Sequence, residues 1–333
     1  MKILILHPGA LGDIILSLPA VLLLRHRFPE AKIILAGDMD KIIVSHPGYA
    51  DKLISLSSLP LHRLYSSMSL PESDLAFWNS FDRIVSWTGH GNPEINQRLG
   101  ELRSDVICGR WRPENGDVRH VSQLFANSLR PWLVFQMDLP EAKIFLGDRN
   151  KEIAGEWLAL KGWKGERLVA LHPGAGGLAK RWPLENFRGL ALQICGADSS
   201  VLILEGPAEY GLGRTLSAGL PPERVYVAES IPLPLLSGLL IHCRAFAGND
   251  SGIAHLAAGL GIPTIVIFGP TMPQQWAPLG KHVSTFWRND GCLACSGGRA
   301  EEHSCLQNIS PGDLWGELKK SLQDTANPST FPR

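Results

Sequence analysis

The sequence lacks an excess of charge of either sign, because 32 Lys and Arg residues balance 32 Asp and Glu residues. This balance argues against bulk electrostatic binding to nucleic acid. A run of 18 apolar residues is also missing, since the stretch 16–24 is interrupted by Ser17 and Pro19. The apolar stretch 3–6 gives way to His7-Pro8-Gly9 and does not read as a signal peptide. We therefore expect a cytoplasmic protein.

Cysteine is scarce, with six residues in the chain, which fits a protein that is not built on disulfides. Three of them are scattered: Cys108, Cys195 and Cys243. The others cluster as Cys292, Cys295 and Cys305, with His303 among them. The first pair has the spacing of a zinc knuckle, but no second pair follows. We interpret the cluster as reduced loop thiols, with a structural zinc site as the alternative.

What the sequence does contain is apolar material for two domains. Its 333 residues are 44% hydrophobic, and at about 150 residues per domain this length suggests two. Residues 2–10 (KILILHPGA) are repeated in pattern at 167–175 (RLVALHPGA). Each copy is a short apolar run, typical of a strand buried on both faces, that enters a glycine-containing loop before a helix. The repeat predicts two similar α/β units.

Strands and helices are predicted to alternate in both halves, as parallel sheets with right-handed crossovers require. The expected helices are 13–27, 183–195, 209–218, 233–242, 251–260 and 312–322, and the further strands are 32–36, 81–86, 200–204, 224–227, 245–247 and 264–268. We predict domains over residues 1–155 and 156–315, followed by a helix end and tail over 316–333. Ligands bind beyond the carboxyl ends of such strands, so both domains are expected to face one central cleft.

The loop Gly9-Ala10-Leu11-Gly12-Asp13 joins the first strand to the first helix. Its glycines permit close approach to the backbone, and the helix N-terminus offers unpaired N–H groups. Asp13 has two interpretations. It is either an acid that stabilises the first helical turn or a carboxylate that acts as a general base.

The second copy of the loop contains a misleading motif. Residues 174–179 (GAGGLA) formally match the dinucleotide-binding fingerprint, and Glu205 is expected to end the next strand. That fingerprint requires a helix to begin within the glycines, whereas here Pro183 is the favoured first helical residue. The loop is therefore about nine residues long, and with Lys180 and Arg181 it suits a phosphate group better than a nicotinamide cofactor. The alternative for both cations is a solvated surface.

A second anion-binding loop is predicted at 248–255 (GNDSGIAH), where a strand ends and a helix begins. The backbone N–H groups of Ser251 and Gly252 suit a diphosphate. Asp250 is otherwise a helix cap, and His255 is otherwise a buried histidine bonded to backbone. Two such loops at strand ends of one half favour a phosphate-binding site over these structural alternatives.

In this order, the motifs resemble glycosyltransferase family 9, the lipopolysaccharide heptosyltransferases, over residues 1–315. The resemblance lies in Gly12-Asp13 after the first strand, the His-Pro-Gly loop followed by Lys180-x-Trp-Pro, Gly206–Glu209, Asn249–His255, and Gly269-Pro270-Thr271. It implies a GT-B fold of two Rossmann-like parallel-sheet domains and an inverting mechanism without metal or cofactor. The N-terminal domain would bind a lipid-linked acceptor and the C-terminal domain ADP-heptose.

The resemblance also implies residue roles. Asp13 is the general base, Lys180 stabilises the diphosphate leaving group, Glu209 holds the ribose and Ile231 lines the adenine pocket. The remaining donor-binding positions are Ala175, Gly176, Asp250, Ser251, Gly252 and His255, and the acceptor-side loop is formed by Gly9, Ala10 and Gly12. Ala175 and Gly176 stand where the family often has Thr or Ser, so only their backbone groups are available to the donor.

We therefore predict a monomeric heptosyltransferase of the lipopolysaccharide inner core, cytoplasmic and in transient contact with the inner membrane. The alternatives are another sugar-nucleotide enzyme of the same fold (with a different donor sugar, or an epimerase), a non-catalytic two-lobed binding protein, and an NAD-dependent dehydrogenase. Candidate acceptor contacts, equally interpretable as solvated charges, are Arg63, Arg110, Arg112, Arg119 and His120.

Overall fold

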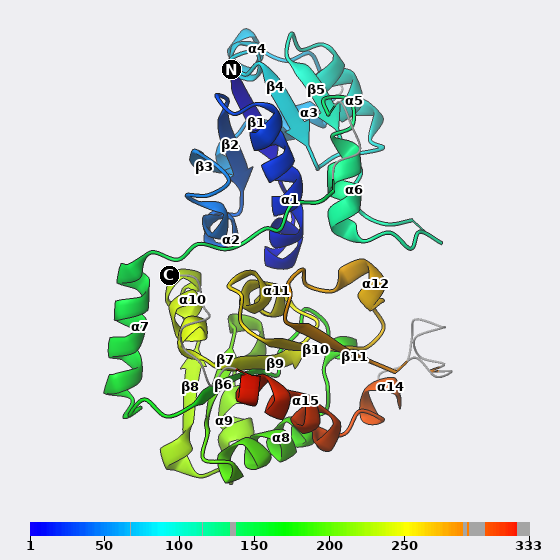
Figure 1. The fold of residues 1–333 in the computed structure, drawn as a ribbon. Coiled ribbons are helices and arrows are strands. Elements are labelled where there is room, and N and C mark those ends of the chain that lie inside the picture. The colour runs from blue at the N-terminus through cyan, green and yellow to red at the C-terminus, as the bar shows by residue number, and fades with distance from the viewer. Residues whose placement is uncertain (67, 115, 134–137, 289–291, 293–303, 325–333) are drawn as a thin grey trace. The chain divides into compact units, whose positions relative to one another are not determined.

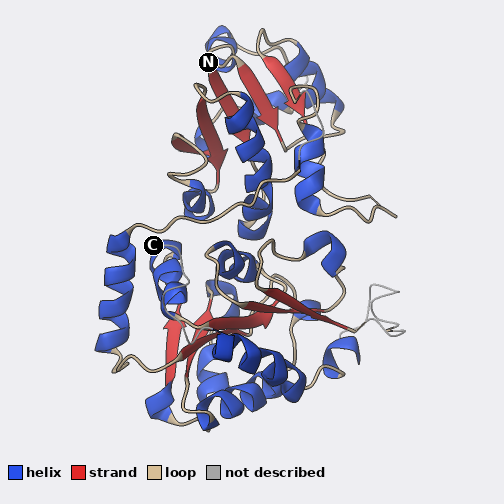
Figure 2. Cartoon of the chain, viewed as in Figure 1, coloured by secondary structure: helices blue, strands red, loops and turns tan. Residues whose placement is uncertain are grey.

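The computed structural model describes residues 1–66, 68–114, 116–133, 138–288, 292 and 304–324. Contacts divide the chain into two compact units, Met1–Phe145 and Leu146–Arg333. Each unit is a parallel sheet with helices packed on its faces, as the ribbon drawings show (Figures 1 and 2). No helix in the described ranges is both long and apolar enough to cross a bilayer.

The first unit contains a five-stranded sheet of order β3-β2-β1-β4-β5. Its strands are β1 (Lys2–Leu6), β2 (Lys32–Gly37), β3 (Lys52–Ser55), β4 (Arg83–Ser86) and β5 (Asp105–Cys108). Four of the five residues of β1 are buried, because this strand lies at the centre of the sheet and is covered on both faces.

Helices cover both faces of this first sheet. They are α1 (Leu11–Arg27), α2 (Met39–Ile42), α3 (Leu61–Leu64), α4 (Glu72–Trp78), α5 (Pro93–Gly100) and α6 (Val121–Ser128). Helix α1 packs against α6 (Figure 1). Leu4 and Ile84 of the sheet belong to one buried core. Leu64 of α3, Trp78 of α4 and Ile95 of α5 pack into the same core.

The second unit contains a six-stranded sheet of order β11-β10-β9-β6-β7-β8. Its strands are β6 (Leu168–His172), β7 (Ser200–Glu205), β8 (Val225–Glu229), β9 (Ala245–Asn249), β10 (Thr264–Phe268) and β11 (Val283–Trp287). The repeated sequence segments thus form β1 and β6, and each is flanked on both sides by other strands of its sheet. The repeat predicted two similar α/β units, and the fold agrees with that prediction.

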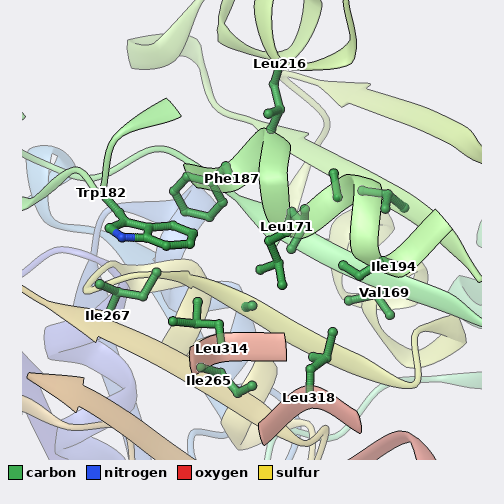
Figure 3. Close-up of a cluster of buried hydrophobic side chains, with 14 of the residues drawn as sticks. Val169, Leu171, Trp182, Phe187, Ile194, Leu216, Ile265, Ile267, Leu314 and Leu318 are labelled. Carbon is green, nitrogen blue, oxygen red and sulfur yellow. The ribbon is translucent and has the colours of Figure 1, made fainter. Parts of the chain in front are cut away.

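The helices of the second unit are α7 (Asp148–Leu160), α8 (Leu184–Gly196), α9 (Leu212–Ser217), α10 (Leu233–His242), α11 (Gly252–Gly259), α12 (Pro273–Trp276), α14 (Ser304–Gln307) and α15 (Pro311–Asp324). Figure 3 shows the core in which Leu171 and Ile265 of the sheet meet Phe187 of α8 and Leu314 and Leu318 of α15. Helix α15 runs across the predicted division at 315–316, and its leucines join it to the second unit.

Several predicted boundaries move in the structure. The predicted helix 209–218 is wrong at its start: Glu209 lies in the 3-10 turn Pro207–Glu209, and α9 begins only at Leu212 because Gly211 takes a left-handed conformation with φ 89°. Helix α7 runs across the predicted division between residues 155 and 156. It packs against α10, so the contact-based division falls after Phe145 instead. The strands 52–55, 105–108 and 283–287 were not predicted.

Candidate active site

The donor-side loops of the second unit emerge from two neighbouring strands. Strand β6 pairs with β9 in parallel, with His172 opposite Gly248. The chain continues from β6 to β7 on one side, whereas β9 lies on the other, so the order of the sheet reverses here. Ligands of open α/β sheets bind at such a reversal, beyond the carboxyl ends of the strands.

Asn249, the last residue of β9, connects the two loops although no exposed surface remains on it. Its Nδ2 donates to the carbonyl of Pro173 at 2.8 Å, and its Oδ1 accepts from the backbone N–H of Trp182 at 2.9 Å. One amide side chain therefore holds both ends of the Lys180 loop against β9. Sequence reasoning assigned no role to Asn249, because its partners lie more than 60 residues away along the chain.

Lys180 and Asp250 form an ion pair, with 2.6 Å between Nζ and Oδ2. The hydroxyl of Thr271 donates to the same Oδ2 at 2.6 Å. The Asp250 side chain is only 7% exposed, whereas that of Lys180 is 32% exposed. The carboxylate is thus fixed by two donors while the ammonium group remains accessible to a ligand. Of Asp250 and Ser251, the two residues predicted as the cap of this helix, Ser251 occupies the cap position.

The N-terminus of α11 carries no side-chain cap. Ser251 stands at the cap position, but its Oγ lies 3.1 Å from Nδ1 of the buried His172. The hydroxyl is thereby directed to β6 rather than to the first turn of its own helix. The start of α11 at Gly252 thus has no side-chain acceptor for its backbone N–H groups. This is the arrangement that binds anions at a helix start. His255 is buried one turn further along α11.

Burial and the positive charge of Arg181 lower the pKa of His172 from 6.5 to about 4. The unfolded chain therefore takes up this proton first as the pH falls, so the free energy of unfolding decreases between pH 6.5 and about 4, by about 1.4 kcal/mol per pH unit at the steepest. His7, whose pKa is lowered to about 3 by burial, adds to the same trend. NMR titration of the imidazole signals, assigned with a His172→Asn variant, should show a neutral His172 at pH 5. A ring that protonates near pH 6.5 would contradict this prediction.

Glu209 belongs to the same group of loops. It is 9% exposed, its Oε2 accepts from the backbone N–H of Gly206 at 3.1 Å, and its Oε1 lies 3.8 Å from Arg181. A side chain at Gly174 would meet Glu209 at 2.5 Å, so the close packing of these two loops requires glycine. Ile231 is half-buried in the segment between β8 and α10. It therefore follows the carboxyl end of β8, the strand beside β7.

Glu205 settles the ambiguity of the dinucleotide fingerprint. Its carboxylate accepts from the backbone N–H groups of Gly211 at 2.7 Å and Gly213 at 2.5 Å, which satisfies the start of α9. The glycines of 174–179 are followed by a 3-10 turn at Leu178–Lys180, and α8 begins at Leu184. A nicotinamide cofactor would need that acid for its ribose and a helix at the glycines, so the structure disfavours the dehydrogenase alternative.

In the first unit, Asp13 lies in the first turn of α1 and is half-buried. Its Oδ2 accepts from the backbone N–H of Ala10 at 2.9 Å. A Cβ at Gly9 would lie 2.6 Å from both the Asp13 side chain and the ring of His7, so only glycine fits. Nδ1 of His7 accepts from the backbone N–H of Gly9 at 3.0 Å. The loop Gly9–Gly12 is thus held from both ends, with Asp13 at its helical end.

The predicted acceptor contacts are mostly bound within the first unit. Arg63 pairs with the buried Asp74 at 2.8 Å, and Arg119 pairs with Asp117 at 2.8 Å. Arg110 pairs with Glu114 and donates to the carbonyl of Arg112. Nδ1 of His120 accepts from the backbone N–H of Ser122 and so caps α6. Arg112 is exposed and stacks on Trp111. Their proposed contact with the acceptor stays a prediction.

The structure brings together, in the second unit, Lys180, Asp250, Ser251 and Glu209, which sequence reasoning had placed in one site. It adds His172, Asn249 and Thr271. Ala175 is buried and Gly176 exposed in the same loop. Asp13 lies in the first unit, with Gly9, Ala10 and Gly12. Of the cysteine cluster, Cys292 and Cys305 are buried, whereas Cys295 and His303 lie outside the described residues.

Two Rossmann-like parallel-sheet units define a protein of the GT-B class, and solved structures agree. Heptosyltransferase II of E. coli superposes with a TM-score of 0.76 at 20% identity, covering 98% of this chain and 100% of that one. An E. coli heptosyltransferase solved with ADP-2-deoxy-2-fluoro heptose gives a TM-score of 0.62 at 16% identity, over 98% and 100% of the chains. The fold predicted from the repeat and the family resemblance is therefore confirmed.

Sequence comparison then shows the family. The model of glycosyltransferase family 9 (heptosyltransferase) matches residues 113–305, which is more than half of the chain. The lipooligosaccharide heptosyltransferase 2 of Haemophilus ducreyi is 26% identical over 353 residues, covering 97% of this chain and 99% of the relative. The chain belongs to glycosyltransferase family 9.

Proposed function

We propose that the protein transfers a heptose from ADP-heptose to the inner core of lipopolysaccharide, with inversion at the anomeric carbon. The observation that carries the proposal is the accessible Lys180 ammonium group beside the uncapped start of α11. A diphosphate needs such a combination of a cation and convergent N–H groups. The names of the relatives, which are heptosyltransferases, support the choice of donor sugar.

In the proposed donor complex, the diphosphate takes the place of Asp250 as a partner of Lys180. Asp250, still held by Thr271, then accepts from a hydroxyl of the heptose. Ser251 and Gly252 donate their backbone N–H groups to phosphate, while Ala175 and Gly176 contribute backbone contacts only. Glu209 accepts from the ribose, Ile231 packs on the adenine, and His255 supports the loop from within α11.

The reaction then follows from charge balance. The acceptor hydroxyl attacks C1 of the heptose from the side opposite ADP, and Asp13 accepts its proton. The bond between C1 and the phosphate oxygen breaks, and its electron pair goes to the diphosphate. Lys180 and the N-terminal end of α11 stabilise that charge, a contribution of about 3–4 kcal/mol for a key group. The proposal requires the hydroxyl bound at Asp13 to reach the donor bound at Lys180.

The acceptor in this proposal is lipid-linked, so the enzyme works in transient contact with the inner membrane. We propose that it does so as a monomer. Calorimetric titration with ADP-heptose, UDP-sugars and GDP-sugars tests the donor. Transfer onto truncated lipopolysaccharide acceptors, with the anomeric configuration of the product read by NMR, tests the reaction. We expect preference for the ADP-sugar and an inverted product. Tighter binding of a UDP- or GDP-sugar, or isomerisation of the donor sugar without transfer, would instead support another sugar-nucleotide enzyme of this fold.

A further inference from the structure

Two hollows on the first unit share the side chain of Leu59. One, of about 340 Å³, lies near the amino ends of β1, β2 and β3 and is lined by Lys2, Lys32 and Lys52. We call it the lysine hollow. The other, of about 790 Å³, lies at the carboxyl ends of the same strands. We call it the hydroxyl hollow, after the side chains of Ser55, Ser57 and Tyr65 that line it.

Strand register places the three lysines on one face of the sheet. Lys2 lies opposite Lys32, and Lys52 lies opposite Ile34, which is two residues beyond Lys32 on β2. Side chains two residues apart point to the same side of a strand. Each of the three strands begins with lysine, so three exposed ammonium groups gather where the strands start.

The protein neutralises these ammonium groups only weakly: Lys32 interacts with the Asp51 carboxylate through its charge, without an ion-pair contact. Within the described ranges, none of them takes part in an ion pair, and the lining of the lysine hollow contains no Asp or Glu. The carboxylate of Asp51 is bound by Arg25 at 2.7 Å, and that of Asp82 by the backbone N–H of Lys2 at 2.6 Å. Three positive charges close together favour binding of an anion that carries several negative charges.

The floor of the lysine hollow is apolar. Ile34, Ile54, Phe77 and Phe81 line it, and Leu59 forms the boundary with the second hollow. A cationic rim over an apolar floor suits a ligand that carries an anionic group next to hydrocarbon, which is the chemistry of a lipid headgroup. A small inorganic anion would leave this floor without a partner.

The hydroxyl hollow has different chemistry and a different neighbour, and its lysine, Lys41, is paired with Asp38 at 2.6 Å. Ser55, Ser57, Tyr65 and the carboxylate of Asp40 supply the hydroxyl and carboxylate groups that hydrogen-bond to sugars. The hollow is also lined by Pro8, the residue directly before the Gly9–Asp13 loop. Sugars bound there would approach the position of the proposed general base.

We propose that the two hollows form one binding track for the acceptor glycolipid, with its lipid-proximal anionic groups in the lysine hollow and its sugars in the hydroxyl hollow. A strand of five residues spans about 17 Å, so the track separates the anionic end of the acceptor from the Asp13 loop by a distance of that order. This inference rests on the proposed function, because it names the acceptor of the same reaction.

The test compares two acceptors that carry the same sugars: a lipid-linked acceptor, and a delipidated one from which the lipid-proximal anionic groups are removed together with the lipid. The variants are Lys32→Gln, Lys52→Gln and their double, and the matched control is Lys143→Gln, an exposed lysine of the first unit that lines neither hollow. For the lipid-linked acceptor, KM should rise roughly fivefold for each lysine removed. The kcat, the KM for the ADP-sugar and the KM for the delipidated acceptor should stay at the wild-type values.

An unchanged KM for the lipid-linked acceptor would overturn the inference, and so would an equal rise for both acceptors.

Co-sedimentation supplies a readout that does not depend on transfer. Micelles of the glycolipid should retain the wild type and Lys143→Gln but not the double variant. If the double variant instead loses binding to anionic phospholipid vesicles without glycolipid to the same extent, the bilayer is the ligand and the inference fails. Lysine-dependent capture of glycolipid by a protein without transferase activity would support the track and refute the proposed function.

Discussion

Replacing Asp13 by Asn should slow heptose transfer by about a thousandfold and leave the affinity for the ADP-sugar unchanged. The carbonyl oxygen of Asn can still accept from the backbone N–H of Ala10, as the carboxylate does at 2.9 Å. The first turn of α1 therefore keeps its hydrogen bond, while the group that we propose to take the acceptor proton is lost. Steady-state kinetics and calorimetric titration of the donor measure the two effects separately.

The companion variant Asp13→Ala removes the base and the hydrogen bond together. It should show the same loss of rate and, in addition, a free energy of unfolding lower by about 1 kcal/mol, as for other lost helix-capping groups. Normal transfer by Asp13→Asn combined with instability of Asp13→Ala would identify Asp13 as a purely structural acid. That result would remove the general base from the proposed mechanism.

Replacing Lys180 by Gln should slow transfer by about a hundredfold, because in the proposed mechanism the departing diphosphate loses the cation that stabilises it. Gln is the informative substitution because its amide can still donate a hydrogen bond to Asp250. Lys180→Ala would instead leave the carboxylate of Asp250, which is 7% exposed, with the hydroxyl of Thr271 but without its cation. Loss of a partner from a buried charge destabilises a fold.

Lys164→Gln, at an exposed lysine of the same unit, serves as the matched control and should transfer at the wild-type rate. Single-turnover measurements separate the chemical step from donor binding. A Lys180→Gln variant that turns over at the wild-type rate would show that Lys180 does not stabilise the leaving group. Its pairing with Asp250 would then be a structural contact only.

Much of the fold could be predicted because its signals are local. The apolar runs at 2–6 and 168–172 are buried central strands, and the predicted helix 233–242 and strand 264–268 have the bounds that the structure gives. Strands β3, β5 and β11 were missed because they are short edge strands with mostly half-exposed side chains. Their pairing in the sheet, rather than their own sequence, makes them strands.

The basic residues of the first unit show where sequence reasoning reaches its limit. Arg63 and Arg119 were candidates for the acceptor because of their charge alone, but the structure gives each an acid partner. Nothing in the sequence marks Lys2, Lys32 and Lys52 as a group, because they stand 20 or more residues apart and only strand register brings them together. Charge can be read from a sequence, whereas the presence or absence of a partner cannot.

The sequence by itself determined the family, the two α/β units and the loops that bear the reactive groups, because those depend on residue order and on periodicity within a few residues. Only the tertiary structure decided which groups act together. Lys180 meets Asp250 across 70 residues, and Asn249 meets Pro173 across 76. Such contacts form where separate strands of a parallel sheet end side by side, and that adjacency is set by the packing of the whole unit.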